Sequence, residues 1–211
     1  CSDAPHSLRH WAIWCGRYHW PVWASLLESV RTGRSARQLS GVDGGTSGYG
    51  HIERDPRGAA VFNRAMVEIT GLVAAGLTGA YDWRHIRHVV DVGGGYGGVI
   101  AALLLAQPAM HGTLFDLPHA MDGAQAHLAH AGVAARCTLV SGSFFDAVPT
   151  GADAYLLKSI LHNWDDGQCV AILSQCRRAM GDDARLLLIE RVMPARSAAV
   201  SRHRPSRGGT G

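Results

Sequence analysis

The sequence has few cysteines, and none of them form a recognisable metal-binding or disulfide pattern. Its 5 cysteines are an odd number and include no C-x-x-C pair, which excludes the usual zinc-ribbon and dithiol motifs. Cys169 and Cys176 lie at helical spacing on an apolar face, where core packing explains them better than metal binding. We therefore expect free buried thiols, no bound metal and the reducing environment of the cytoplasm.

Long apolar runs and a strong charge of one sign are also missing. No apolar segment approaches the ~18 residues of a membrane span, and no secretory signal opens the chain. Charged residues make up only 18% of the 211 residues, hydrophobic residues make up 47%, and the formal net charge is +3. This composition predicts a soluble globular protein that acts neither on membranes nor on nucleic acid.

What the sequence does contain, from residue 81 onward, is an alternation of short apolar runs and longer helical segments. The runs VVDV and LLLI lack polar alternation, which is typical of parallel strands covered by helices on both faces. The fold class is therefore predicted to be α/β, with a doubly wound, mainly parallel, Rossmann-like sheet. We expect five strands, at 88–93, 111–117, 137–142, 153–159 and 184–192, and helices at 97–106, 118–130 and from Cys169 to Met180.

Residues 1–80 have a different pattern and are expected to form a helical segment that packs on the sheet. Residues 20–33 look helical, 41–50 form a glycine-rich loop, and a longer helix begins at Pro56. Residues 196–211 have several arginines and no apolar period, which predicts a disordered basic tail. Three parts are thus expected: 1–80, 81–195 and 196–211.

The run DVGGGYGG follows the first predicted strand and opens the first predicted helix. Glycines there let the backbone turn tightly and approach a ligand. Gly93, Gly95 and Gly98 satisfy the GxGxxG spacing of dinucleotide enzymes. With Asp91 and Gly97, the same run equally satisfies the D-x-G-x-G-x-G pattern of S-adenosylmethionine sites. The run alone leaves both cofactors open, and a glycine-rich turn without a ligand is the third alternative.

Two further segments end at the same predicted edge of the sheet. Asp116 closes the second strand, where a carboxylate can accept both ribose hydroxyls of either cofactor. Phe144 follows the third strand, where it either packs on an adenine ring or joins the core. Ligands of open parallel sheets bind at the carboxyl ends of the strands, so both residues are candidate contacts.

The segment LLKSILHNWDDGQC carries the candidate chemistry. Lys158 and His162 fall just past the fourth strand, and Glu190 falls at the end of the fifth. Adjacent strands bring this glutamate near the imidazole, and a carboxylate behind a histidine sets its tautomer and basicity as a general base. A hydride-transfer enzyme can use the same pair. Asp165 or Asp166 is placed to cap the following helix, which accounts for both without a metal.

These segments, in their order along the chain, resemble those of a known family. The matching stretches are VVDVGGGYG, TLFDLPH, SGSFFDAVP, GADAYLLKSILHNWDD and LLLIERVMP, preceded by SLRHWAIW, SVRTG and DPRGAAVFNRAMVEIT. They resemble the S-adenosylmethionine-dependent O-methyltransferases of the caffeic acid and hydroxyindole O-methyltransferase type, including bacterial members of secondary metabolism. The resemblance covers roughly residues 5–195, and the ILHNWDD block is quite specific.

The resemblance implies a class I methyltransferase sheet that binds S-adenosylmethionine. The family usually has aspartate where Ser143 stands, so its hydrogen bonding to the cofactor is expected to be weaker here. The implied cofactor contacts are Asp91, Gly93, Gly95, Gly97, Asp116, Leu117, Ser143, Phe144 and Lys158.

The resemblance also implies the roles of the remaining site residues. His162 matches the base that removes the proton of the acceptor hydroxyl, and Glu190 matches the carboxylate that orients it. Asn63 and Met66 fall in the helix that faces the acceptor, although core packing explains Met66 as well. The implied acceptor is a small aromatic or polyketide-type metabolite with a hydroxyl, phenolic in type, and no metal is required.

The sequence departs from the family at both ends. The family's core continues with two further strands and a second glutamate, whereas this chain turns into its arginine-rich tail. A truncated or frame-shifted chain is expected, with the edge of its fifth strand unpaired. The family is homodimeric, but its dimerisation domain is largely missing here. Two alternatives to the methyltransferase therefore stay open: a nicotinamide-dependent oxidoreductase, and a non-catalytic fragment that only binds cofactor.

Overall fold

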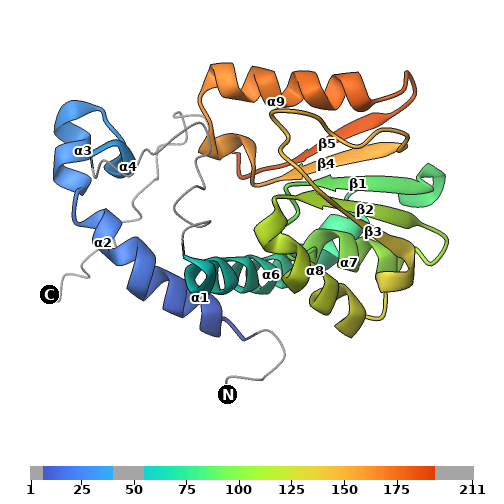
Figure 1. Ribbon diagram of the computed structural model, residues 1–211, viewed down its shortest axis with the longest axis horizontal. Coiled ribbons are helices and arrows are strands. Elements are labelled where there is room, and N and C mark those ends of the chain that lie inside the picture. The colour runs from blue at the N-terminus through green and yellow to red at the C-terminus, as the bar shows by residue number, and fades with distance from the viewer. Residues whose placement is uncertain (1–6, 40–54, 193–211) are drawn as a thin grey trace, which may run out of the picture.

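The computed structural model describes residues 7–39 and 55–192 of the chain (Figure 1). The amino-terminal part is helical, as expected, and the remainder alternates strands and helices. In chain order the helices are α1 (Arg9–Trp14), η1 (Cys15–His19), α2 (Trp20–Trp23), α3 (Leu26–Thr32), α4 (Ala36–Leu39), α6 (Pro56–Gly79), η2 (Trp83–His85), α7 (Gly98–Ala106), α8 (Pro118–His130), η3 (Ala134–Arg136), η4 (Leu161–Asn163) and α9 (Asp166–Ala179). The strands are β1 (His88–Val92), β2 (His111–Asp116), β3 (Cys137–Ser141), β4 (Ala154–Lys158) and β5 (Arg185–Ile189).

The five strands form one parallel sheet in the order β3-β2-β1-β4-β5, so the α/β prediction is confirmed. The central strand β1 pairs with β2 on one side and β4 on the other; Val90 lies opposite Thr113 and Tyr155. The chain crosses from one half of the sheet to the other between β3 and β4. This topology creates a switch point at the carboxyl ends of β1 and β4, where ligands of such sheets bind.

Alternating residues of the buried strands feed two separate cores, which explains why the strand runs are apolar throughout. Val89 and Leu114 pack with α7 and α8, whereas Val90 and Phe115 pack with α9. Figure 1 shows α9 along one face of the sheet and α6, α7 and α8 along the other. Successive side chains of a strand point to opposite faces, so a strand covered on both faces is apolar at most of its positions.

The long helix α6 connects the amino-terminal segment to the sheet, because it packs on α7 and also carries α1. The carboxylate of Glu68 accepts hydrogen bonds from the backbone N–H groups of His10 at 3.2 Å and Trp11 at 3.0 Å. These are unpaired donors of the first turn of α1, so a side chain of α6 caps the shorter helix. Trp14 adds an aromatic contact with Phe62 of α6, with ring centroids 4.9 Å apart.

Two expectations for this segment need correction. The predicted single helix over 20–33 is interrupted after Trp23 and continues as α3, and α1 was not predicted. The predicted loop at 41–50 and the predicted tail at 196–211 lie outside the described residues.

At the opposite edge of the sheet, β5 pairs with β4 and with no other strand in the part of the chain that the structure describes. No helix within residues 7–39 and 55–192 combines the length and the apolarity that crossing a bilayer requires.

Candidate active site

A cavity of about 230 Å³ lies at the carboxyl edge of the sheet, at the topological switch point. The glycine loop after β1, the ends of β2 and β4, and the segment after β3 form its walls. One face of α6, the long helix that precedes the sheet in the chain, forms a further wall. The structure therefore brings most of the predicted cofactor contacts around one hollow, although they are separated by up to 67 positions, from Asp91 to Lys158.

The glycine loop forms the floor of this cavity and needs glycine for two reasons. Gly93, Gly95 and Gly97 have φ angles of 71°, 59° and 82°, in the left-handed region that side chains disfavour. A Cβ atom at Gly93 would also lie 2.7 Å from Cδ1 of Ile160. Gly97 differs from the other two because it does not line the cavity; it is the N-cap residue of α7. Its observed role is to turn the chain into the helix.

Asp91 is a buried acid beneath the loop. Only 1% of the residue is exposed, and its Oδ2 atom has no hydrogen-bond partner among the described residues. Burial raises the pKa of this carboxyl to about 7, an effect that the nearby Lys158 opposes. Burial also lowers the pKa of the Lys158 ammonium, whereas the charges of Asp91 and Glu190 raise it. A buried acid with a free oxygen is thus available to a cationic group in the cavity.

Asp116 is held at the end of β2 by two short backbone hydrogen bonds. Its carboxylate accepts from the N–H of Gly95 and from the N–H of Leu117, each at 2.6 Å. Burial raises the pKa of Asp116, and these two hydrogen bonds oppose the rise because they favour the ionised form. A carboxylate has about four lone-pair positions, so Asp116 keeps acceptor capacity for further hydroxyl groups.

The segment after β3 supplies an aromatic wall. Phe144 lines the cavity and meets Trp164 edge to face, with ring centroids 5.8 Å apart. It also packs on the core beneath α9, so the expected core role is confirmed, and its contact with an adenine ring stays a prediction. Ser143 lines the cavity, and its hydroxyl accepts a hydrogen bond from the N–H of Phe145 at 3.2 Å.

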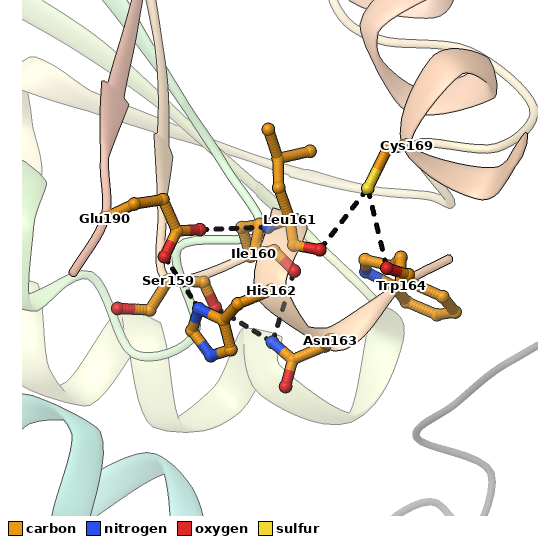
Figure 2. Close-up of polar contacts among 8 residues, drawn as sticks. All are labelled: Ser159, Ile160, Leu161, His162, Asn163, Trp164, Cys169 and Glu190. Atoms are coloured by element: carbon orange, nitrogen blue, oxygen red, sulfur yellow. Dashed lines mark hydrogen bonds and ion pairs between the residues drawn. The ribbon is translucent and has the colours of Figure 1, made fainter. Parts of the chain in front are cut away.

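The turn between β4 and α9 places the candidate base (Figure 2). It begins at Ser159, which has a φ of 56°, a conformation that costs energy for any residue with a side chain. The side-chain amide of Asn163 donates to the carbonyl of Ser159 at 3.0 Å and closes the turn. Asp165 then caps α9 by accepting from the N–H of Gln168, which confirms the predicted cap.

The imidazole of His162 and the carboxylate of Glu190 point toward each other across this turn (Figure 2), with 2.6 Å between Nδ1 and Oε2. The other carboxylate oxygen accepts from the N–H of Leu161 at 3.0 Å. Glu190 therefore fixes both the ring and the backbone that carries it. Neither residue of the pair lines the cavity, and the side chain of His162 is 56% exposed. The two lie beside the cavity, next to its wall residues Ser159 and Ile160.

Asn63 and Met66 both line the cavity from α6, but their surroundings differ. Asn63 is buried, with 3% exposed, and lies against the glycine loop. Met66 also packs on the aromatic cluster around Trp14, so its alternative role in the core is real.

Sequence reasoning missed several wall residues, including Thr70, Tyr96, His119, Ile160 and Trp164. Thr70 follows Asn63 and Met66 at helical spacing, so that periodicity was a usable signal. The others are single residues in turns and helix starts, where no periodic pattern marks a position as facing a cavity.

Comparison with known proteins identifies the family of the chain. The family model described as the O-methyltransferase domain matches residues 23–205. The chain belongs to this family. It is 41% identical over 193 residues to the phenazine O-methyltransferase PhzM of Lysobacter antibioticus, a match covering 92% of this chain and 56% of the relative.

Among solved structures, NcsB1, an O-methyltransferase from neocarzinostatin biosynthesis, matches with a TM-score of 0.78 and 38% identity, over 90% of this chain and 58% of that one. It was solved with S-adenosylmethionine and 2-hydroxy-5-methyl naphthoic acid. The aclacinomycin 10-hydroxylase RdmB of Streptomyces purpurascens is also similar, with 38% identity over 81% of this chain and 45% of that protein. The chain thus spans about half the length of the curated relatives it matches.

Proposed function

We propose that this chain is an S-adenosylmethionine-dependent O-methyltransferase whose general base is His162, oriented by Glu190. The observation that carries the proposal is the position of this pair, 2.6 Å apart, at the same sheet edge as a glycine-floored cavity. The methyl acceptor is proposed to be a small aromatic metabolite with a phenolic hydroxyl, the class to which the naphthoic acid bound by NcsB1 belongs.

The residues of the cavity fit this cofactor in charge and shape. Asp91 offers a buried carboxylate oxygen without a partner, which suits the ammonium group of the cofactor's amino-acid portion. Gly93 lines the cavity without a side chain, which lets a ligand approach its backbone closely. Asp116 has lone pairs for the ribose hydroxyls, and Phe144 offers an apolar face to the adenine ring. When bound, the cofactor supplies an electrophilic methyl group on a sulfonium, which leaves as a neutral thioether.

The task left to the protein is to remove the hydroxyl proton of the acceptor. A phenol has a pKa of about 10, so it is mostly protonated at neutral pH. The Glu190 carboxylate accepts hydrogen bonds only, so His162 keeps its proton on Nδ1 and presents the lone pair of Nε2. A positioned base of this kind contributes about 10²- to 10⁴-fold to the rate. Holding the acceptor oxygen at roughly 3 Å from the methyl carbon contributes separately.

Two experiments test the proposal. Calorimetric titration with S-adenosylhomocysteine and with NADH separates the methyltransferase from the nicotinamide-dependent alternative; binding of S-adenosylhomocysteine alone is expected. Transfer of a labelled methyl group to a panel of phenols then separates an active enzyme from a fragment that only binds cofactor. Binding of NADH alone would reverse the assignment. Because the similar protein RdmB is a hydroxylase, membership of the family does not replace this assay.

A further inference from the structure

One side chain of the cavity lacks the hydrogen bonds that its burial requires. Asn63 lines the cavity from α6 with only 3% of its surface exposed. Its Nδ2 atom has no hydrogen-bond partner in the described part of the chain. Leaving a buried polar group unpaired is costly, so such groups in native proteins are usually satisfied by a ligand or by water. The family resemblance implies that this residue faces the methyl acceptor, but its surroundings indicate a contact with the cofactor instead.

Asn63 lies against the glycine loop near the first turn of α7. Its Oδ1 atom is 3.0 Å from the position that a Cβ atom of Gly95 would take. Two turns along α6, Thr70 lies 3.3 Å from the corresponding position of Gly98, the first residue of α7. The N-cap residue of α7 is Gly97, which has no side chain to cap the helix. The first turn of α7 also contains no acidic residue. The start of a nine-residue helix is favourable for an anion, and Asn63 adds a buried amide donor beside it.

The charges of the cavity indicate which anion this is. The amino-acid portion of the cofactor carries one ammonium and one carboxylate. The free oxygen of Asp91 lies 2.6 Å from the position of a Cβ atom on Gly94, next along the loop, and it suits the ammonium. Asp91 also attracts Lys158, whose other neighbouring carboxylate is Glu190, so the ammonium of this lysine is shared between two protein acids. The amide of Asn63, by contrast, is a buried donor of this cavity that has no partner among the described residues.

We infer that the side-chain amide of Asn63 donates a hydrogen bond to the carboxylate of the cofactor's amino-acid portion. The inference rests on the proposed function, and it moves Asn63 from the acceptor to the cofactor. Asp91 lies beside Gly94 and Asn63 lies beside the next residue, Gly95. Asp91 then binds the ammonium of the zwitterion, and Asn63 binds its carboxylate. A ligand that keeps the amine but lacks the carboxylate loses the contact with Asn63 and keeps the contact with Asp91.

Calorimetry on the full chain tests this with two probes: S-adenosylhomocysteine and its decarboxylated analogue. The unsubstituted chain is expected to bind S-adenosylhomocysteine roughly 10- to 100-fold more tightly than the analogue. Asn63→Leu is expected to remove most of this preference, weakening S-adenosylhomocysteine while changing the analogue by less than about threefold. Asn63→Asp, which keeps the shape and places a second acid at the site, is expected to reverse the preference. Thermal unfolding of each variant checks that it folds.

Arg64→Leu is the matched control, because Arg64 is the exposed neighbour of Asn63 on α6 and does not line this cavity. It removes a nearby positive charge and is expected to leave the preference intact. Equal weakening of both probes by Asn63→Leu, or an unchanged preference in both Asn63 variants, overturns the inference and leaves the proposed function standing. Failure of the unsubstituted chain to bind S-adenosylhomocysteine overturns the proposed function itself.

Discussion

The glycine-floored cavity and the His162–Glu190 pair lie at the same edge of the sheet but differ in their exposure to water. Asp91 in the cavity is 1% exposed, whereas the side chains of His162 and Glu190 are 56% and 20% exposed. Burial controls protonation in the cavity, where it raises the pKa of Asp91 to about 7. At the pair, a direct 2.6 Å hydrogen bond sets the proton position instead. The difference indicates that cofactor binding and proton removal can be perturbed separately.

The largest expected effect comes from removing the base. His162→Ala is expected to lower methyl transfer by about 10²- to 10⁴-fold, because it removes the imidazole that is proposed to take the hydroxyl proton. Single-turnover transfer of a labelled methyl group to an accepted phenol measures this loss. A more acidic phenol, which is already ionised at the assay pH, is the control; it is expected to lose much less. Unchanged transfer in the variant removes His162 from the mechanism.

A smaller loss is expected when the carboxylate behind the base is neutralised. Glu190→Gln leaves one oxygen to accept from either His162 or Leu161, so the ring is less firmly oriented and its preferred tautomer is weakened. We expect a loss of about 10- to 100-fold, the range found when a carboxylate that orients a metal-binding histidine is changed. The same transfer assay, with its pH profile, checks the prediction. A variant as fast as the unsubstituted chain at every pH contradicts the proposed role of Glu190.

The buried acid predicts an opposite kind of effect, on stability. The folded-state pKa of Asp91 is raised to about 7, above its unfolded value, so the folded chain binds the extra proton between these two values. Stability is therefore lost as pH rises through this window, by about 2 kcal/mol between pH 5 and 7 from this one group. Urea unfolding of the unsubstituted chain and of Asp91→Asn measures it. The variant is expected to show a shallower decline; identical slopes contradict the assignment.

The smallest expected effect is on cofactor affinity, and a pair of glycine variants separates backbone strain from contact with the ligand. Gly93→Ala and Gly151→Ala both place a methyl group on a left-handed residue, at φ 71° and 86°. Each is expected to cost about 1–2 kcal/mol of stability. Only Gly93 lines the cavity, and only its Cβ atom meets another side chain; nothing lies within 4 Å of the corresponding atom at Gly151. Calorimetry is expected to show roughly tenfold weaker binding of S-adenosylhomocysteine for Gly93→Ala alone. Equal weakening in both variants contradicts the distinction.

Much of the sheet could be predicted from the sequence because its three central strands, β1, β2 and β4, are buried on both faces. Runs such as VVDV show no alternation of apolar and polar residues, which is typical of buried parallel strands. Glycine or acidic residues at the ends of the first two runs mark the edge of the sheet where ligands bind. The contact between His162 and Glu190 follows from the pairing of adjacent strands, since Lys158 and Ile189 are register partners in β4 and β5. Asp165 was predictable because capping chemistry is local.

The rest depends on tertiary packing that sequence patterns do not contain. The six-residue helix α1 is too short to be stable alone and depends on the cap that Glu68 provides from α6, 57 positions away from Trp11. The contact between Asn63 and Gly95 joins two parts that were expected to be separate segments. The position of His162 beside the cavity, and not in its wall, depends on the turn closed by Asn163. The roles of these residues in catalysis stay predictions.

The affinity of His162→Ala for S-adenosylhomocysteine tests most directly whether the cavity and the base are separate. Calorimetry is expected to give a dissociation constant within about twofold of the unsubstituted chain, because the imidazole does not line the cavity. A loss of affinity as large as the loss of methyl transfer would contradict this account, because the histidine would then support the cofactor site and not the removal of a proton.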